Sequence, residues 1–169
     1  MLLFKKKLTL FLICSLFFIS ACGFQPIYAT RPNGPDISQQ LAQIQITNIP
    51  DRSGQKIRNL LIDRMYTQYR PKNPLYTLSI FSIKEIRRSL GIKKDASATR
   101  SQIVITLNLN LIETATGKSV MKRALKSTNS YNILDSQFTT MVTEKDARER
   151  ALSQLSDDIM TQLSLYFNR

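Results

Sequence analysis

The chain has 169 residues, of which 43% are hydrophobic, and this suits one domain with an ordinary core. Its 24 Lys and Arg residues against 12 Asp and Glu give a formal net charge of +12, which in a cytosolic protein would first suggest a nucleic-acid partner. The sequence contains no histidine, which excludes a Ser-His catalytic triad and any metal site built on histidine.

The first 21 residues have the pattern of a secretory signal peptide. Three lysines precede an uncharged, mostly apolar run from Leu8 to Ile19. That run is too short to cross a hydrocarbon core of about 30 Å as a helix rising about 1.5 Å per residue. It also lacks the polar face of a buried amphipathic helix. A positive start, a short apolar run and small residues before a cleavage point predict a removed signal at residues 1–21.

Cys22 follows this run and has three interpretations: a core residue, half of a disulfide, or a modified residue. The sequence Ile19-Ser20-Ala21-Cys22 resembles a bacterial lipobox, in which the cysteine is acylated and becomes the first residue of the mature protein. Cys14 lies inside the predicted signal, so Cys22 would have no disulfide partner. Acyl chains on Cys22 would anchor the protein to a membrane, and no other cofactor is expected.

This compartment changes what the basic charge means. Gly23 follows the cysteine in place of the aspartate that resembles an inner-membrane retention signal, which favours the outer membrane. Loss of the three signal lysines leaves a formal charge of +12 − 3 = +9 on the mature chain. A domain on the periplasmic side of that membrane meets no nucleic acid, but it meets the phosphates of anionic lipids and glycolipids.

The mature chain is predicted to begin with a tether, because three prolines and an Asn-Gly pair interrupt residues 22–40. Alternation of apolar and polar residues then predicts a strand at Leu41–Ile49. Apolar residues spaced by three and four predict a helix from Asp51 or Ser53 to about Tyr69.

Three β segments are predicted next, at Leu75–Arg88, Gln102–Glu113 and Ser119–Thr128. They are joined by a polar hairpin region, Gly91–Arg100, and by a Gly-containing turn, Thr114–Lys118. The middle segment alternates cleanly between aliphatic residues and Asn or Thr. One of its faces is therefore expected to be buried, and the other to be wet or to lie against a polar partner.

The last predicted element is a helix that begins with a capping-box variant, Thr143 to Asp146, and carries an apolar stripe from Ala147 to Phe167. The element order is then β-α-β-β-β-α. It predicts an α+β sandwich, with a mostly antiparallel four-stranded sheet and two helices packed on one face, as a single domain over residues 41–169.

Short islands of sequence occur in order along the mature chain. They are ACGFQPIY at Ala21–Tyr28, DASATR at Asp95–Arg100, TGK at Thr116–Lys118, SYN at Ser130–Asn132, and FTTMVTEKDARERAL from Phe138, leading to LSLYF near the C-terminus. Together with the lipobox they resemble the LPS-assembly lipoprotein family LptE, in its alphaproteobacterial form. Gln25 and Ile27 depart from this pattern, where a basic residue and a leucine would be expected.

The resemblance implies a role that is not enzymatic. Proteins of this family sit as a plug inside a large outer-membrane β-barrel, LptD, help it to fold, and act with it to bring lipopolysaccharide to the cell surface. The implied partners are therefore LptD, lipopolysaccharide, and the membrane through the lipid anchor. The domain would lie on the periplasmic side and within the barrel lumen.

Two basic clusters are candidate sites. The hairpin cluster consists of Arg87, Arg88, Lys93, Lys94 and Arg100. Its cations could reach a lipopolysaccharide phosphate together, or they could form a solvated turn that protects the sheet edge. Within the family this hairpin lies in the region implicated in glycolipid contact, which raises Lys93 and Lys94 above the rest.

The second cluster, on the last predicted strand, consists of Lys118, Lys122, Arg123 and Lys126, with the same two readings. Lys122 and Lys126 share one face of that strand and Arg123 points to the other.

Two aromatic residues near the last helix are candidates for contact with the barrel wall. Tyr131 and Phe138 could make that contact, or they could pack their loop onto the end of the sheet. In the helix itself, Glu144 with Arg148 and Asp146 with Arg150 are spaced as i, i+4 ion pairs and need no ligand.

Catalysis finds little support in the sequence. Cys22 is taken by the anchor, Asp157 and Asp158 would point about 100° apart on a helix, and the five glycines form no phosphate-binding cluster. Two other functions remain open from the residues alone. They are an adaptor or pilotin lipoprotein for another envelope complex, and a stand-alone lipoprotein that binds anionic glycolipids.

Overall fold

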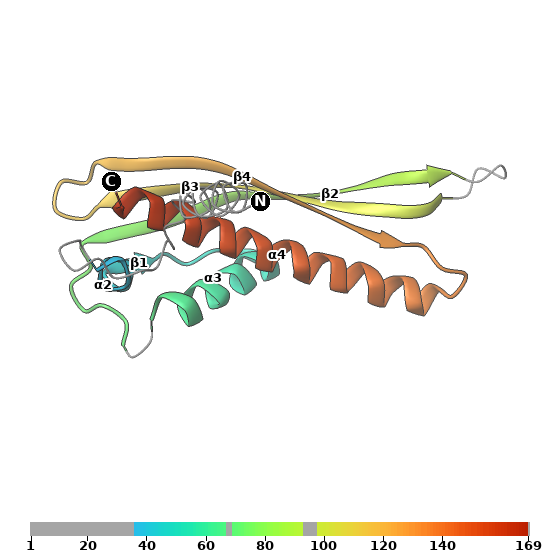
Figure 1. Ribbon diagram of the computed structural model, residues 1–169, viewed down its shortest axis with the longest axis horizontal. Coiled ribbons are helices and arrows are strands. Elements are labelled where there is room, and N and C mark those ends of the chain that lie inside the picture. The colour runs from blue at the N-terminus through green and yellow to red at the C-terminus, as the bar shows by residue number, and fades with distance from the viewer. Residues whose placement is uncertain (1–35, 67–68, 93–97, 169) are drawn as a thin grey trace, which may run out of the picture.

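A four-stranded sheet with helices on one of its faces forms the part of the chain that this computed structural model describes, residues 36–66, 69–92 and 98–168 (Figure 1). The elements in chain order are α2 (Ile37–Ala42), β1 (Ile44–Ile46), α3 (Asp51–Met65), β2 (Tyr76–Ile92), β3 (Ala98–Glu113), β4 (Ser119–Asn132) and α4 (Gln137–Phe167). The sheet order is β1-β2-β3-β4. β1 runs parallel to β2, and the other pairs are antiparallel, so the predicted α+β class is confirmed.

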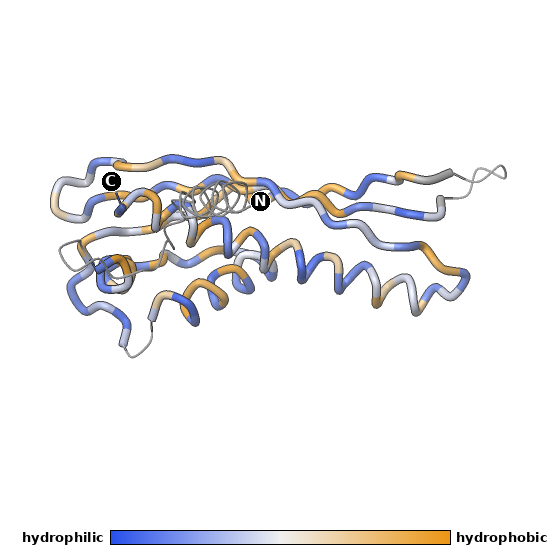
Figure 2. The backbone as a smooth tube through the Cα atoms, in the orientation of Figure 1, coloured by the Kyte–Doolittle hydropathy of each residue, from blue (hydrophilic) through white to orange (hydrophobic). Residues whose placement is uncertain are grey.

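One core lies between the sheet and the helices. Hydrophobic and hydrophilic residues alternate along the strands and recur at each turn of α4 (Figure 2). The buried row of β3 consists of Ile103, Ile105, Leu107, Leu109 and Leu111. It packs in the same cluster as Leu155 and Ile159 of α4 and Ile57 and Leu61 of α3. The alternation in β3 was therefore a reliable signal of which face is covered.

The start of the domain differs from the prediction. The strand expected at Leu41–Ile49 is reduced to Ile44–Ile46, because Ile37–Ala42 form helix α2. Asp36 caps this helix by accepting a hydrogen bond from the Ser38 N–H at 2.9 Å. Buried Ile37 and Leu41 attach the helix to the core, so the end of the predicted tether belongs to the folded domain.

Several element ends also differ from the prediction. α3 ends at Met65 instead of near Tyr69, β2 continues to Ile92, and β4 continues to Asn132. α4 begins at Gln137, six residues before the predicted start at Thr143.

The cause of the early start of α4 is the cap. The Ser136 side chain accepts a hydrogen bond from the Thr139 N–H. The Thr143 hydroxyl instead donates to the Asn132 carbonyl, which ties the helix to the end of β4.

Gly54 lies where α3 meets the segment before it, and its missing side chain matters. A Cβ at this position would lie 3.1 Å from the Ile49 Cβ and 3.3 Å from the Ile49 carbonyl carbon, and Ile49 is fully buried. We expect Gly54→Ala to lower the free energy of unfolding by about 1–2 kcal/mol, because overpacking outweighs the gain in helix propensity. Urea unfolding measures this change. The control is Asn59→Ala at an exposed position of the same helix, which should change the free energy of unfolding by about 0.5 kcal/mol or less. A stabilised Gly54→Ala would contradict the tight contact.

The Tyr66 side chain closes the other end of α3 by donating a hydrogen bond from its hydroxyl to the Ile44 carbonyl. Burial raises the pKa of Tyr66 above its usual value of 10.0. The unfolded chain therefore loses the proton first, and this contribution to stability is complete below about pH 10 and lost as the pH rises through the folded-state pKa. We expect Tyr66→Phe to cost about 1 kcal/mol at pH 7, a deficit that shrinks above pH 10. Unfolding curves from pH 7 to 11 measure it, and a constant deficit would contradict the shift.

Candidate functional site

A β-bulge in β2 decides which side chains of this strand face the helices. Phe81 pairs with Asn108 and Lys84 with Thr106, so two residues of β2 lie opposite a single residue of β3. Ser82, within the bulge, has a φ of 54°. Before the bulge the even-numbered side chains of β2 face the helices, and after it the odd-numbered ones do.

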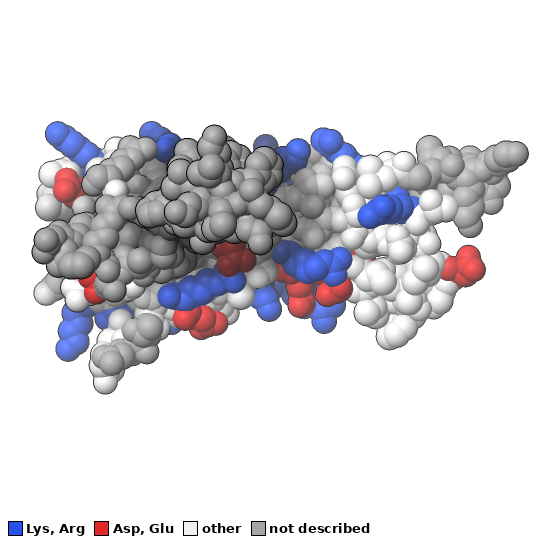
Figure 3. Space-filling model, in the orientation of Figure 1, with Lys and Arg blue, Asp and Glu red and all other residues white. Residues whose placement is uncertain are grey.

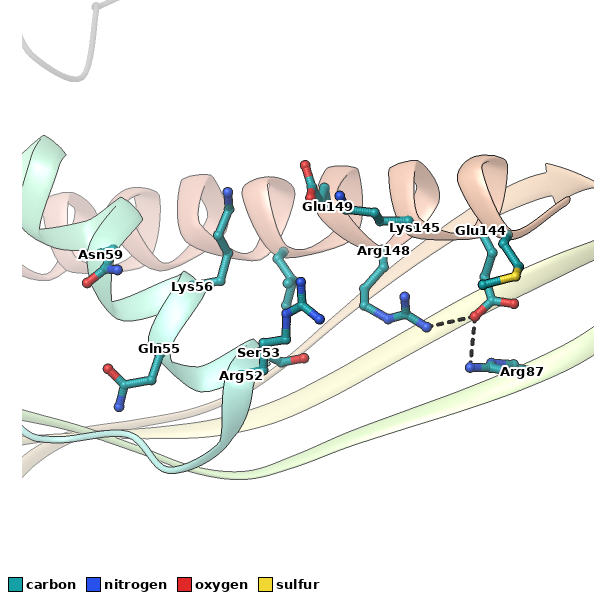
Figure 4. A pocket seen from close by; sticks show the side chains of 12 residues that line it. Arg52, Ser53, Gln55, Lys56, Asn59, Arg87, Glu144, Lys145, Arg148 and Glu149 are labelled. Atoms are coloured by element: carbon teal, nitrogen blue, oxygen red, sulfur yellow. Dashed lines mark hydrogen bonds and ion pairs between the residues drawn. The ribbon is translucent and has the colours of Figure 1, made fainter. Parts of the chain in front are cut away.

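Beyond the bulge, the helix-facing side of β2 carries charge, which pairs with α4 (Figure 4). Arg148 donates two hydrogen bonds to Glu85, each 2.9 Å long, from Nε to Oε2 and from Nη2 to Oε1. Arg148 Nη2 also lies 2.8 Å from Glu144 Oε1, and so does Arg87 Nη2. The hydroxyl of buried Tyr131 donates to Glu144 at 3.3 Å. We call these five residues the clamp, because they join α4 to the distal half of the sheet.

The clamp accounts for the shifted protonation equilibria in this region. Hydrogen bonds with Glu85 raise the pKa of Arg148 above its ordinary value. Burial raises the pKa of Tyr131, and the Glu144 carboxylate adds to that shift. Both groups therefore keep their protons throughout the physiological range.

The outer face of the sheet, away from the helices, is the strongest candidate for binding anions. The pairing register places Lys84 and Arg88 of β2, Arg100 of β3, and Lys122 and Lys126 of β4 on this face. No carboxylate of the described strands shares it, and none of these five cations makes an ion pair with a described residue. In Figure 3, blue side chains line the upper margin over the strands, whereas most red ones lie lower, over the helices. We call these five residues the cationic face.

A pocket at the bulge focuses this charge. Lys84 and Lys126 both pair with Thr106, one from each neighbouring strand. The pocket has a volume of about 290 Å³, and its polar lining includes Ser82 and Asn108 beside these three residues. Two ammonium groups with hydroxyl and amide donors between them match the needs of a phosphate.

A larger hollow lies on the opposite side of the molecule, between α3 and the first half of α4 (Figure 4). This α3–α4 groove has a volume of about 640 Å³, and its cations are Arg52, Lys56, Arg87, Lys145 and Arg148. Two of them, Arg87 and Arg148, are held by Glu144. Glu149 also lines the groove, so its charge is mixed and the cationic face is the better anion site.

The structure rearranges the two predicted basic clusters. Arg88 and Arg100 of the hairpin cluster share the outer face with Lys122 and Lys126 of the strand cluster. Arg87 lies on the other side of the sheet, in the clamp. Lys93 and Lys94 lie outside the described residues.

One further cation lies on the side of its strand that its parity predicts, and another was missed by the sequence analysis. Arg123 faces the helices, where its Nε donates to the Gln162 side chain at 3.2 Å. Lys84 belongs to the cationic face but was missed, because without the bulge both Lys84 and Arg88 would face the helices. The run Phe81-Ser82-Ile83, which breaks the alternation of β2, was the one signal of that change.

The two candidate aromatic residues have opposite environments. Tyr131 is 8% exposed and contacts Glu144, as a residue that packs its loop would. Phe138 is 77% exposed, near exposed Met141 and Val142 on the first turns of α4. Packing of the loop therefore does not explain Phe138.

The described residues contain neither a membrane-spanning helix nor a group of three metal-ligating side chains. Cys22 lies outside those residues. Among the described helices, none combines the length and apolar character needed to cross a bilayer. The described residues also contain no group of three Cys, Asp or Glu placed to hold a metal ion.

Comparison with known proteins gives a family and a fold. The sequence model of the LptE family, described as lipopolysaccharide-assembly, matches residues 41–163. No curated protein matches the sequence.

Three solved lipoprotein structures share the fold. A lipoprotein from Caulobacter crescentus CB15 is 18% identical with a TM-score of 0.62, over 78% of this chain and 95% of that one. Lipoprotein B from Nitrosomonas europaea is 14% identical with a TM-score of 0.57, over 73% of this chain and 82% of that one. The rare lipoprotein B from Shewanella oneidensis is 10% identical with a TM-score of 0.56, over 72% of this chain and 91% of that one.

Proposed function

We propose a function from the premise that this chain belongs to the LptE, lipopolysaccharide-assembly, family. The protein is an outer-membrane lipoprotein, anchored by acyl chains on Cys22. It acts with the LptD β-barrel as plug and assembly factor for the transport and insertion of lipopolysaccharide at the cell surface. Its role is structural and is not that of an enzyme.

The observation that carries this proposal, beside the family, is the cationic face. A plug must present a polar surface to a wet barrel interior, and the outer face of β3 offers Gln102, Thr106, Asn108 and Asn110. Its five cations share this face with no carboxylate from the described strands, and they supply the positive charge that glycolipid phosphates require.

Within this proposal the residues divide into two roles. The cationic face contacts the phosphates of lipopolysaccharide, and Lys93 and Lys94 are proposed as further contacts from the sequence alone. Exposed Phe138, with Met141 and Val142 on the first turns of α4, contacts the barrel wall. The clamp holds β2, which carries Lys84 and Arg88, in a fixed position beside α4.

Depletion and complementation test the proposal. Cells depleted of the protein are expected to retain lipopolysaccharide inside, and the wild-type gene is expected to restore surface labelling. Cys22→Ala should fail to restore it, because a chain without acyl groups loses its attachment to the membrane. Surface lipopolysaccharide that stays normal on depletion would contradict the proposal. Glycolipid binding in vitro without any association with LptD would instead identify a stand-alone carrier.

A further inference from the structure

The distal part of β2 is an open edge of the sheet. β1 pairs with β2 at Tyr76–Leu78, and the sheet order leaves no other described strand on that side. From Ser79 to Ile92 the strand therefore has one neighbour among the described strands, β3, which runs beside it in Figure 1.

The backbone groups on this open edge can be assigned. The Thr47 N–H donates to the Leu78 carbonyl at 3.0 Å, so the backbone groups of Leu78 point away from β3. Along an antiparallel strand, the backbone N–H and C=O groups of successive residues point alternately toward and away from the neighbouring strand, and the bulge shifts this alternation by one residue. Beyond the bulge, the backbone groups of Glu85, Arg87 and Ser89 therefore point away from β3. Among the described residues, none hydrogen-bonds to those outward groups.

The opposite edge of the sheet, β4, is partly covered by side chains. The Lys122, Ser130 and Asn132 carbonyls accept hydrogen bonds from the side chains of Arg123, Arg150 and Thr143, respectively. The same alternation makes these the outward carbonyls of β4. The two edges therefore differ: described side chains cover three outward carbonyls of β4 and none of the outward groups of Glu85, Arg87 and Ser89 in β2.

The side chains along the open edge are unusually apolar for an exposed strand. Phe81 is 48% exposed, Ile86 47% and Leu90 50%. Lys84 and Arg88 flank Ile86 on the outer face. A long edge with exposed apolar residues is a place where another strand adds to a sheet.

We propose that β2 between Lys84 and Leu90 binds an extended acidic segment of another protein, which adds a fifth strand to the sheet. On the outer face the partner strand would carry an apolar residue beside Ile86 and acidic residues beside Lys84 and Arg88. This contact goes beyond the glycolipid role and does not depend on it.

Charge argues against a second copy of this chain as the occupant. Antiparallel pairing of two β2 edges about Ile86 would place Lys84 opposite Arg88 twice on the outer face. The Glu85–Arg87 pairs of the same register would have to compete with the partners that these residues already have in the clamp. Pairing about Arg87 would place the two Arg87 side chains opposite each other. Like charges directly opposite destabilise a strand pair, so an acidic strand fits this edge better than the same edge from a second molecule.

A charge swap tests the proposal with the acylated mature protein in detergent micelles. The probe is a seven-residue peptide of Thr and Val with Glu at positions 2 and 6, and its control has Lys at both positions. The wild-type protein should bind the Glu peptide roughly tenfold more tightly or better, and Lys84→Glu with Arg88→Glu should reverse the preference. Hydrogen exchange should slow at the Glu85, Arg87 and Ser89 amides when the Glu peptide binds.

A proline variant separates backbone pairing from charge. Ser89→Pro removes an N–H that points outward and makes no hydrogen bond to β3, so the sheet keeps its own pairing. Thr128→Pro is the matched control, because the Thr128 N–H points outward from the β4 edge in the same way. Loss of peptide binding in Ser89→Pro alone would support the proposal. Equal affinity for both peptides, or binding without amide protection, would overturn it. So would binding to anionic vesicles in place of the Glu peptide, which would identify the edge as a lipid contact.

Discussion

Reversing charge on the cationic face should weaken binding of a phosphorylated glycolipid by roughly a hundredfold or more. The variant is Lys84→Glu, Arg100→Glu and Lys126→Glu. Each of these cations can make a charge-assisted hydrogen bond, worth about 1.5–3 kcal/mol, and the new carboxylates would repel the phosphates. All three side chains are exposed and lie in paired strands, so the fold should persist. Binding of purified lipopolysaccharide to the acylated protein in detergent, at fixed salt, measures the change.

The matched control is Arg52→Glu, Lys56→Glu and Lys145→Glu in the α3–α4 groove. It changes the net charge by the same amount at exposed positions on the opposite side of the molecule. Any effect of overall charge on encounter with an anionic ligand is therefore common to both variants. The groove variant should bind lipopolysaccharide at most severalfold more weakly than the wild-type protein. A larger loss in the groove variant than in the face variant would move the binding site to the groove.

Removing Arg148 should destabilise the domain by about 1–3 kcal/mol, the largest effect of any single charged residue described. Arg148→Met keeps the aliphatic part of the side chain but leaves Glu85 and Glu144 without their shared partner. The side chains of Arg148 and Glu85 are only partly buried, so the loss of stability should be smaller than that for a fully buried ion pair. Thermal and urea unfolding measure it.

Arg150→Met is the matched control for this prediction. Arg150 pairs with Asp146 one turn apart on the same helix, and both side chains are about half exposed. Surface pairs of this kind contribute little, so the control should change stability by about 0.5 kcal/mol or less. Equal losses in the two variants would mean that the clamp is an ordinary surface ion pair. Hydrogen exchange should also quicken in distal β2 in Arg148→Met alone.

The sequence predicted those parts of the fold that repeat a pattern over many residues. The strict alternation of β3 and the apolar stripe of α4 each extend over several periods, and both elements are found. The short helix α2 could not be found in this way, since six residues hold too few periods. Its one local signal was Asp36, a residue type that caps helices.

The candidate site was harder to predict because its composition depends on one inserted residue. Strand alternation places Arg100 of β3 on the outer face, but it does not reveal that a bulge near Ser82 shifts every later side chain of β2, including Arg88. Arg87 therefore moved from the candidate glycolipid site into the clamp, and Lys84 entered the cationic face. Periodicity within one strand carries no information about the register with its neighbour.

Co-purification tests the central claim, a partnership with the LptD barrel, most directly. The protein is extracted from outer membranes with detergent through a C-terminal tag, and the proteins that come with it are identified and quantified. The proposed function predicts LptD in about equal amount, retained when the cationic face is reversed, because barrel contact is assigned to other residues. A secretin in its place, or no barrel at all, would contradict the claim.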